Sequence, residues 1–176
     1  MEWKRKEIRY RDILDILSQD PRIRELEKYP QHEVTNSFVH SHNVAVYAFH
    51  LARKKDWGID LNTLALGAML HDYYLYDIKE SGLTDYQHGV RHPVTALENA
   101  GRCFDIDDKV KNIILSHMWP LPFVERPKSR EAVLVNLADK YCAYQEMKNG
   151  IVHIEDVIKS PYRLKKGQKP DCFSRL

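Results

Sequence analysis

The sequence predicts an all-α fold built as a single domain, and three observations lead to this prediction. The 176 residues lie within the roughly 100–200 residues of one domain, which is long enough to bury a hydrophobic core without disulfides or a structural metal. Signals that begin and end helices recur from one end of the chain to the other. Seven glycines, eight prolines and little alternation of Val and Thr argue against a β protein.

Residues 1–35 are predicted to form a helical extension that packs against the rest of the chain. Asp20 followed by Pro21 is an N-cap with proline at the first helical position. Pro30 ends the short helix that these two residues begin, because proline cannot continue a helix interior.

The next two helices are predicted from their caps. Asn36 or Ser37 caps a long helix that runs to about Asp56 and is stopped by Gly58. Asp60 caps the helix that follows, which has the sequence LNTLALGAMLHD. That helix is almost wholly apolar until its last two residues.

Three further helices complete the predicted domain, which spans residues 36–147. Pro93 begins a helix that ends at Gly101. The segment DIDDKVKNIILSHMW is capped by its own acids and is halted by Pro120. Ser129 opens the last strong helix, which ends at Gly150. Residues 148–176 are predicted to hold one short helix before Pro161 and then a basic tail.

Composition and charge exclude several classes of protein. The net charge is +2, and the 27 basic and 25 acidic residues are mixed, so no nucleic-acid partner is required. The N-terminus has charges where a signal peptide needs an apolar core, and no apolar run approaches the roughly 20 residues that cross a bilayer. Three widely spaced cysteines, Cys103, Cys142 and Cys172, indicate reduced thiols. We therefore expect a cytoplasmic protein without a membrane partner.

Polar side chains that can bind metal recur on the apolar faces of separate predicted helices. His40 shares its face with four apolar residues: Val44, Tyr47, Ala48 and Leu51. His117 shares a face with Val110, Ile113 and Ile114 in the same way. Asp139 lies inside the apolar segment VLVNLADKYCAY, and His71 and Asp72 end the most apolar helix of the chain.

A single histidine on an apolar face is usually a hydrogen-bonded core residue, but several buried ionisable groups cost free energy unless they are paired or bind a metal. Mixed imidazole and carboxylate ligands suit first-row transition metals, and helical bundles build such sites from facing helices. His71 and Asp72 are adjacent, so their side chains point about 100° apart. One arrangement that satisfies both has His71 on one ion and Asp72 between two ions, with His92 and its neighbours supplying further ligands.

These motifs resemble the HD superfamily of metal-dependent phosphohydrolases, whose pattern is H…HD…D. The matching residues are, in order, His40, His71, Asp72 and Asp139. The segments RHPVTALENA and ILSHMWP resemble the two-metal subgroup, which includes diadenosine tetraphosphatases, and HDYYLYD is similar to a set of uncharacterised bacterial HD proteins. The resemblance covers about Ser37 to Tyr144 and implies an HD-type helical bundle with an N-terminal helical extension.

The resemblance also implies a ligand set and a cofactor. The first metal would be held by His40, His71, Asp72 and Asp139. The second metal would be held by His92 and His117, with Asp72 bridging the two ions. One or two divalent ions are implied, drawn from Fe, Mn, Mg, Ni, Co and Zn. His42 and His88 lie in the same motifs and are left with roles beside the ligands, in substrate binding or in the fold.

The chain departs from many two-metal relatives after the HD pair. Those relatives continue with a small residue, a glycine and a lysine that meets phosphate, whereas here Tyr73, Tyr74 and Leu75 follow. The two tyrosines either stack on a base or pack in the core, and packing is the favoured alternative. Tyr76 is assigned to neither.

Residues beside the ligands are candidates for the chemistry. Lys79, Arg91 and Lys140 are cationic and would meet charge that develops on phosphoryl oxygens. Asp77 is a candidate general acid or base, and Asp72 would act at the reaction centre through both metals.

The predicted function is metal-dependent hydrolysis of a phosphate ester or anhydride in a small phosphorylated molecule, with a nucleotide as the preferred substrate. Neither a Ser/His/Asp triad nor a GxxxxGK[ST] motif is present, so a protein nucleophile and ATP-driven chemistry have no support. Two alternatives use the same residues: an HD-type di-iron oxygenase and a non-catalytic sensor that binds a nucleotide. No heptad repeat predicts an oligomeric state.

Overall fold

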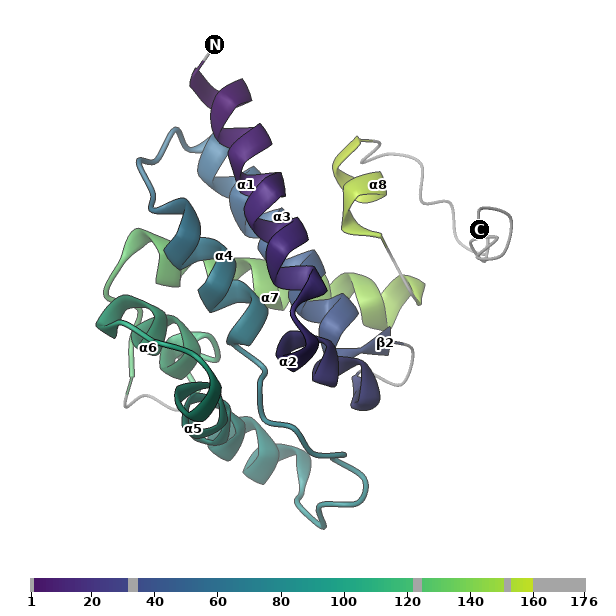
Figure 1. Cartoon of the computed structure of the whole chain (residues 1–176). Coiled ribbons are helices and arrows are strands. Elements are labelled where there is room, and N and C mark those ends of the chain that lie inside the picture. The colour runs from purple at the N-terminus through teal and green to yellow at the C-terminus, as the bar shows by residue number, and fades with distance from the viewer. Residues whose placement is uncertain (1, 32–34, 122–124, 151–152, 160–176) are drawn as a thin grey trace.

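The computed structural model describes residues 2–31, 35–121, 125–150 and 153–159, and it confirms the all-α prediction (Figure 1). The elements are, in order, α1 (Glu2–Gln19), α2 (Pro21–Arg24), a 3-10 helix η1 (Glu25–Lys28), β1 (Pro30–Gln31), β2 (Thr35–Asn36), α3 (Ser37–Lys54), α4 (Leu61–Leu70), α5 (Asp85–Cys103), α6 (Asp108–Ser116), α7 (Arg130–Asn149) and α8 (Ile154–Lys159). The two short strands were not predicted; they pair antiparallel, with Pro30 opposite Asn36.

The helices pack around α3 and α4, which lie side by side in the middle of the molecule. α7 crosses α3 on one side, and α6 packs against both α4 and α7 (Figure 1). α5 packs against α6, and α8 packs against α3. The buried core joins these helices, because apolar residues of α3, α4, α6 and α7 form one contiguous cluster. The basic tail, Pro161 and Cys172 lie outside the described residues, whereas Cys103 and Cys142 are free thiols as predicted.

The N-terminal helix α1 is part of this core. Tyr10 is buried, donates a hydrogen bond from its hydroxyl to the backbone oxygen of Ala45 at 3.0 Å, and stacks on Phe49 with ring centroids 4.5 Å apart. Farther along, Ile23 and Leu26 are fully buried between the extension and the bundle. The extension therefore contributes apolar area to the same core as the helices that follow it.

Most predicted helix starts are confirmed by cap hydrogen bonds. The cap side chains accept from the backbone N–H groups of the first turn; they belong to Asp20, Asn36, Asp60, Asp107 and Ser129. Gly150 ends α7 with a positive φ of 77°, a conformation that favours glycine.

The predicted start of a helix at Pro93 is wrong. α5 begins eight residues earlier at Asp85, because Thr84 and Gln87 form a reciprocal capping box, and it ends at Cys103 rather than Gly101. Pro93 lies inside the helix and is tolerated there, where the residue four positions earlier is the buried Gly89. The correction places His92 in the middle of a helix instead of at its mouth.

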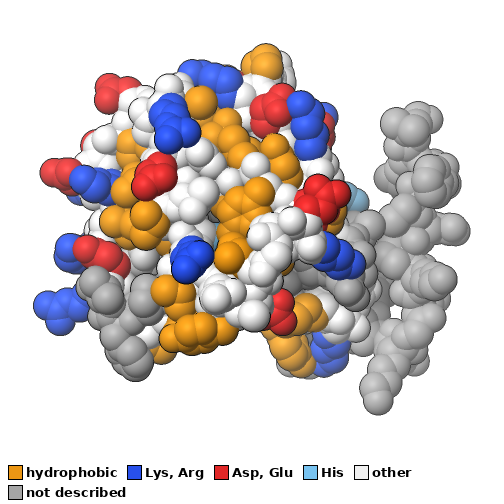
Figure 2. Space-filling view, turned by 90° about the horizontal axis from the view of Figure 1, so that it is seen from below, with side chains coloured by type: hydrophobic (Ala, Val, Ile, Leu, Met, Phe, Trp, Pro, Cys, Tyr) orange, Lys and Arg blue, Asp and Glu red, His pale blue; other side chains and the backbone are white. Residues whose placement is uncertain are grey.

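The surface of the described residues carries mixed charge. In the view of Figure 2, Lys and Arg side chains alternate with Asp and Glu side chains around patches of hydrophobic side chains. None of the helices in the described ranges is long and apolar enough to cross a membrane.

Close packing of α4 on α6 depends on Gly67. A Cβ at this position would lie 2.5 Å from Cδ1 and 2.9 Å from Cγ2 of Ile113, which is fully buried. We expect Gly67→Ala to destabilise the fold by about 1–3 kcal/mol, since overpacking forces a backbone shift. The measurement is the midpoint of urea unfolding. The matched control is Gly101→Ala in α5, where a Cβ meets nothing within 4 Å and should not destabilise the protein; equal midpoints for the two variants would contradict the packing argument.

Candidate metal centre

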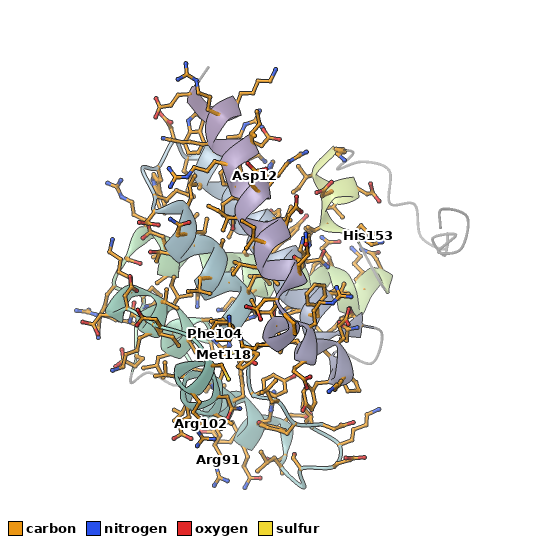
Figure 3. The ribbon with its side chains drawn as sticks, viewed as in Figure 1. Asp12, Arg91, Arg102, Phe104, Met118 and His153 are labelled. Carbon is orange, nitrogen blue, oxygen red and sulfur yellow. The ribbon has the colours of Figure 1, made fainter. Side chains whose placement is uncertain are left out.

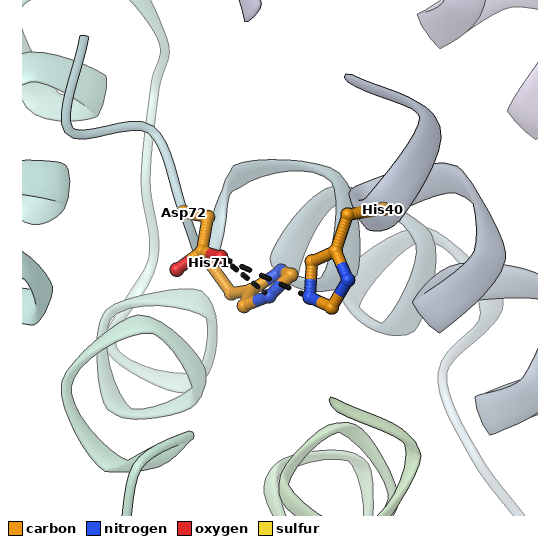
Figure 4. A group of neighbouring side chains, drawn as sticks. All are labelled: His40, His71 and Asp72. Atoms are coloured by element: carbon orange, nitrogen blue, oxygen red, sulfur yellow. Dashed lines mark ion pairs between the residues drawn. The ribbon is translucent and has the colours of Figure 1, made fainter. Parts of the chain in front are cut away.

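Five helices bring the six predicted metal ligands together in the interior. His40 lies in the first turn of α3, His92 in the middle of α5 and Asp139 in α7. His71 and Asp72 directly follow α4, and His117 directly follows α6; all six side chains are buried. Figure 4 shows His40 and His71 converging on the Asp72 carboxylate.

The first cluster lies between α3, α4 and α7. His40 Nε2 is 3.1 Å from Asp139 Oδ1 and 3.8 Å from Asp72 Oδ2. His71 Nε2 is 3.4 Å from the same Asp72 oxygen and 3.8 Å from Asp139 Oδ1. His40, His71 and Asp72 each present one ligand atom within a group small enough to share a single ion.

The second cluster uses the other oxygen of the same aspartate. His92 Nε2 and His117 Nε2 lie 3.2 and 3.4 Å from Asp72 Oδ1, and 2.7 Å from each other. These three residues also form a group that could hold an ion. Asp72 therefore faces each cluster with one carboxylate oxygen, which is the position of a bridging ligand.

Backbone carbonyls fix the direction of three of the imidazoles. The Nδ1 atoms of His71 and His117 lie 2.7 Å from the backbone oxygens of Ala68 and Ile114, three residues earlier in each case. The last carbonyls of a helix have no partner within the helix, so a histidine placed just past its end can bond one of them. His92 Nδ1 similarly lies 3.0 Å from the backbone oxygen of His88. A proton on each Nδ1 leaves the lone pair on Nε2, and this lone pair points into the cluster.

The donor set fits a divalent cation. Within the described part of the chain, His71 Nε2 and Asp72 Oδ1 are buried and have no hydrogen-bond partner, which is costly in the interior. Two Nε2 lone pairs, of His92 and His117, face each other at 2.7 Å, and this contact is repulsive unless a cation lies there. A proton shared between those two rings would relieve that contact alone and would leave His71 Nε2 unsatisfied. Metal ions would satisfy all four atoms.

Electrostatics keep the carboxylates ionised. Burial works against ionisation, but the hydrogen bond of His40 and the nearby imidazole of His71 hold the pKa of Asp139 well below its usual range. The histidines around Asp72, His71 first, likewise overcome burial and lower the pKa of that carboxyl. Burial alone lowers the pKa of His40, yet the carboxylates of Asp139 and Glu146 outweigh it and raise that pKa to about 10. Burial lowers the pKa of His117, which is the opposite direction to the shift of His40.

The raised pKa of His40 makes the stability of the chelated protein depend on pH. A pKa that is raised on folding, from 6.5 to about 10, stabilises the fold fully below pH 6.5, and the effect is lost as pH rises towards 10. We therefore expect the melting temperature of the chelated protein to fall from pH 6.5 to 9, whereas metal-loaded protein falls less because the ion replaces the proton. Thermal melts with and without chelator test this. Against burial, Asp72 and Asp139 also raise the pKa of His71, so His40→Ala should show a smaller fall than the parent; an equal fall in the parent and the variant would contradict the assignment.

Among the described residues, Glu146 and Gln31 contact side chains of the ligands and were not predicted from the sequence. Glu146, which is 1 % exposed, places Oε2 2.8 Å from His40 Nδ1. Its position seven residues after Asp139, on the same face of α7, was a signal that could have found it. Gln31, in β1, donates from Nε2 to Asp72 Oδ2 at 2.6 Å. No local pattern points to Gln31, because it lies 41 residues from its partner.

The predicted phosphate-contacting and acid–base residues lie at or near the surface, outside the buried cluster. Lys79 and Arg91 are exposed, and Arg91 lies at the lower edge of the molecule in Figure 3. Asp77 is half-buried and accepts a hydrogen bond from the backbone N–H of Lys79 at 2.8 Å. Lys140 donates to the backbone oxygen of His117 at 3.1 Å, beside the second cluster.

The aromatic residues after the HD pair are packing residues, as the favoured alternative predicted. Tyr73 and Tyr74 are 1 % and 2 % exposed, so neither ring face is available to a base. Tyr76 is half-buried and hydrogen-bonds His88 Nδ1 at 2.8 Å. The His88 ring in turn stacks on His92 with centroids 4.6 Å apart, and burial together with this neighbour lowers the pKa of His88 to about 4.

Comparison with known proteins gives one result. The family model described as HD domain matches residues 37–144, more than half of the chain and the same segment over which the sequence resembles the HD superfamily. All six predicted ligand positions lie inside this segment, whereas Gln31 and Glu146 lie outside it. No curated protein and no solved structure matches the chain.

Proposed function

Because the chain belongs to the HD domain family of metal-dependent phosphohydrolases, we propose that it hydrolyses a phosphate ester or anhydride bond in a small phosphorylated molecule, with a nucleotide as the substrate class. The observation that carries the proposal is the position of Asp72, with one carboxylate oxygen facing each of two buried histidine clusters. Two ion sites that share a carboxylate are suited to the displacement of a leaving group by water.

In the proposed centre, the first ion would be held by His40, His71, Asp72 and Asp139. The second ion would be held by Asp72, His92 and His117. Such ions would supply water with a pKa lowered towards ~7 and would neutralise charge on the attacking and leaving oxygens. The chain itself fixes the imidazoles through backbone carbonyls and keeps both aspartates ionised. Tyr74 is buried and packs against the ring of His92, with ring centroids 5.7 Å apart.

Contacts to the phosphate are proposed for the cationic side chains around the centre. Lys79 and Arg91 are exposed and can therefore meet a substrate that arrives from solvent. Asp77, in the loop that follows the HD pair, is the proposed general acid or base. Of these three residues, Asp77 is the one whose loss should change the pH dependence of the rate, because it would transfer a proton.

The test begins with protein purified without chelator and without affinity nickel. Metal content is measured per chain, and hydrolysis is then assayed with p-nitrophenyl phosphate, nucleoside mono-, di- and triphosphates, and dinucleoside polyphosphates, in the presence of Mn²⁺, Co²⁺, Ni²⁺, Mg²⁺, Zn²⁺ or Fe²⁺. We expect release of phosphate or nucleotide above the level of chelated protein. Metal-loaded protein that hydrolyses none of these compounds would contradict the proposal.

Two other outcomes would identify the alternative functions. A buried centre of imidazoles and a bridging carboxylate also suits iron, so oxygen consumption by iron-loaded protein without hydrolysis would indicate the di-iron oxygenase. Tight binding of a nucleotide without turnover would indicate the sensor. Both measurements use the same metal-loaded protein and the same panel of nucleotides.

A further inference from the structure

Glu146 is a buried carboxylate that contacts His40 at Nδ1, the ring nitrogen that does not face the other ligands. It lies on α7, seven residues after Asp139, and is 1 % exposed. Its Oε2 atom is 2.8 Å from His40 Nδ1, and its Oε1 atom accepts a hydrogen bond from Asn43 Nδ2 at 3.1 Å. A buried carboxylate is costly unless it is hydrogen-bonded, and here both oxygens have partners.

His40 differs from the other three cluster histidines in the acceptor at its Nδ1 atom. His71, His92 and His117 bond backbone carbonyls of their own helices, which are neutral acceptors. His40 bonds a carboxylate from another helix, 106 residues away in the chain. A carboxylate behind a ligating histidine fixes its tautomer and raises the basicity of the other ring nitrogen.

The two clusters are consequently unequal in charge. The first cluster faces Asp72 and Asp139 directly, and Glu146 acts on it through His40. Among the described residues, Asp72 is the one carboxylate that faces the second cluster, together with two imidazoles. We propose that Glu146 is a positioning residue that holds the proton of His40 on Nδ1 and makes the first cluster the tighter metal site. This inference rests on the metal centre of the proposed function, and it concerns metal affinity rather than the reaction.

The side chain of Asn43 requires Glu146 to present a hydrogen-bond acceptor. The backbone N–H of Ile154 donates to Asn43 Oδ1 at 3.3 Å, so the amide of Asn43 turns its Nδ2 towards Glu146. The donor at Asn43 and the donor at His40 Nδ1 both require an acceptor, and a carboxylate supplies two. The start of α8 therefore sets the tautomer of His40 through two side chains.

Substitution of Glu146 by glutamine breaks this pattern, because an amide has one acceptor and one donor. If its nitrogen faces Asn43 Nδ2, two donors oppose each other. If its nitrogen faces His40 Nδ1, that atom must accept, and the ring proton moves to Nε2, where it blocks the ligand lone pair. Adding Asn43→Asp restores complementarity, since the new carboxylate accepts from both the glutamine amide and the Ile154 N–H.

The experiment measures Co²⁺ affinity at each site. Metal-free protein is titrated with Co²⁺, with visible absorption and calorimetry as readouts. We expect Glu146→Gln to weaken the tighter site about 10- to 100-fold, to leave the weaker site unchanged, and to alter the visible spectrum of the first ion. The double variant Asn43→Asp/Glu146→Gln should recover most of the affinity. The matched control is Glu131→Gln, another buried glutamate of α7, which accepts from the backbone N–H of Asp60.

Three results with the variants would overturn the inference. The first is a tighter site in Glu146→Gln that stays within twofold of the parent. The second is an equal loss of affinity in Glu131→Gln, which would show a general effect of removing a buried charge. The third is a double variant that folds, as judged by circular dichroism, but recovers none of the Co²⁺ affinity of the tighter site. The double variant is compared with the parent, so this result counts even if Glu146→Gln alone does not fold. A parent that binds two ions without hydrolysis would contradict the proposed reaction and leave this inference intact, whereas a parent that binds none would overturn both.

Discussion

Asp72→Asn is expected to remove both metal ions and to reduce hydrolysis to the level of the chelated protein. Asp72 presents Oδ2 to His71 and Oδ1 to His92 and His117, so one residue serves both clusters. The amide of asparagine is neutral and turns a donor towards one cluster, which opposes a cation there. Without bound metal, water keeps its ordinary high pKa instead of one near ~7, and hydroxide at neutral pH is lost.

The measurement is metal content per chain by elemental analysis, followed by the hydrolysis assay with the best substrate of the panel. Asp77→Asn is the matched control for metal content, because it makes the same chemical change five residues farther on, in a half-buried position that binds the Lys79 backbone. It should keep both ions. Two ions in purified Asp72→Asn would contradict the bridging position.

His117→Ala is expected to empty the second site and to leave the first. The imidazole of His117 lies 3.4 Å from Asp72 Oδ1, whereas the first cluster is built from His40, His71 and Asp139. Metal content should fall from about two ions to about one. Hydrolysis should fall about 10²- to 10³-fold, which is the usual effect of losing one group that stabilises developing charge.

The control for His117→Ala is His88→Ala. His88 stacks on His92 at the edge of the same cluster, but its ring nitrogen Nδ1 is bonded to Tyr76, so its removal should leave both ions in place. His40→Ala is the reciprocal variant and should empty the first site. If His117→Ala retains two ions, then His92 and His117 are core or substrate residues and the protein has a single-metal centre.

Much of the candidate site could be predicted because its signals are local. His40 and Asp139 each stand among apolar residues at helical spacing, and this spacing alone predicts that both side chains lie in the core. The caps at Asn36 and Ser129 determine where the helices that carry these residues begin, and the cap at Asp60 begins the helix that leads to His71 and Asp72. Caps and apolar periodicity depend on a few neighbouring residues, and such patterns can be recognised in a single sequence.

The errors and omissions have a different origin. Pro93 is a strong helix-start signal, but the helix begins at the capping box of Thr84 instead and runs through Pro93. Gln31 and Glu146 could not be assigned their partners, since their contacts with Asp72 and His40 join residues 41 and 106 positions apart. Only the packing of the extension and of α7 against the centre creates these two contacts.

Because of the contact from Gln31 to Asp72, the segment that matches the family begins later in the chain than the structural unit that holds the metal centre. The HD domain match begins at residue 37, and a fragment cut there would retain every histidine and aspartate of the centre. Among the described residues, Gln31 is the only N-terminal residue whose side chain donates to the Asp72 carboxylate, and the fragment would lack it. The fragment would also lose the aromatic packing of Tyr10 on Phe49. The smallest unit able to hold the centre as the structure has it is therefore larger than the segment by which the family is known.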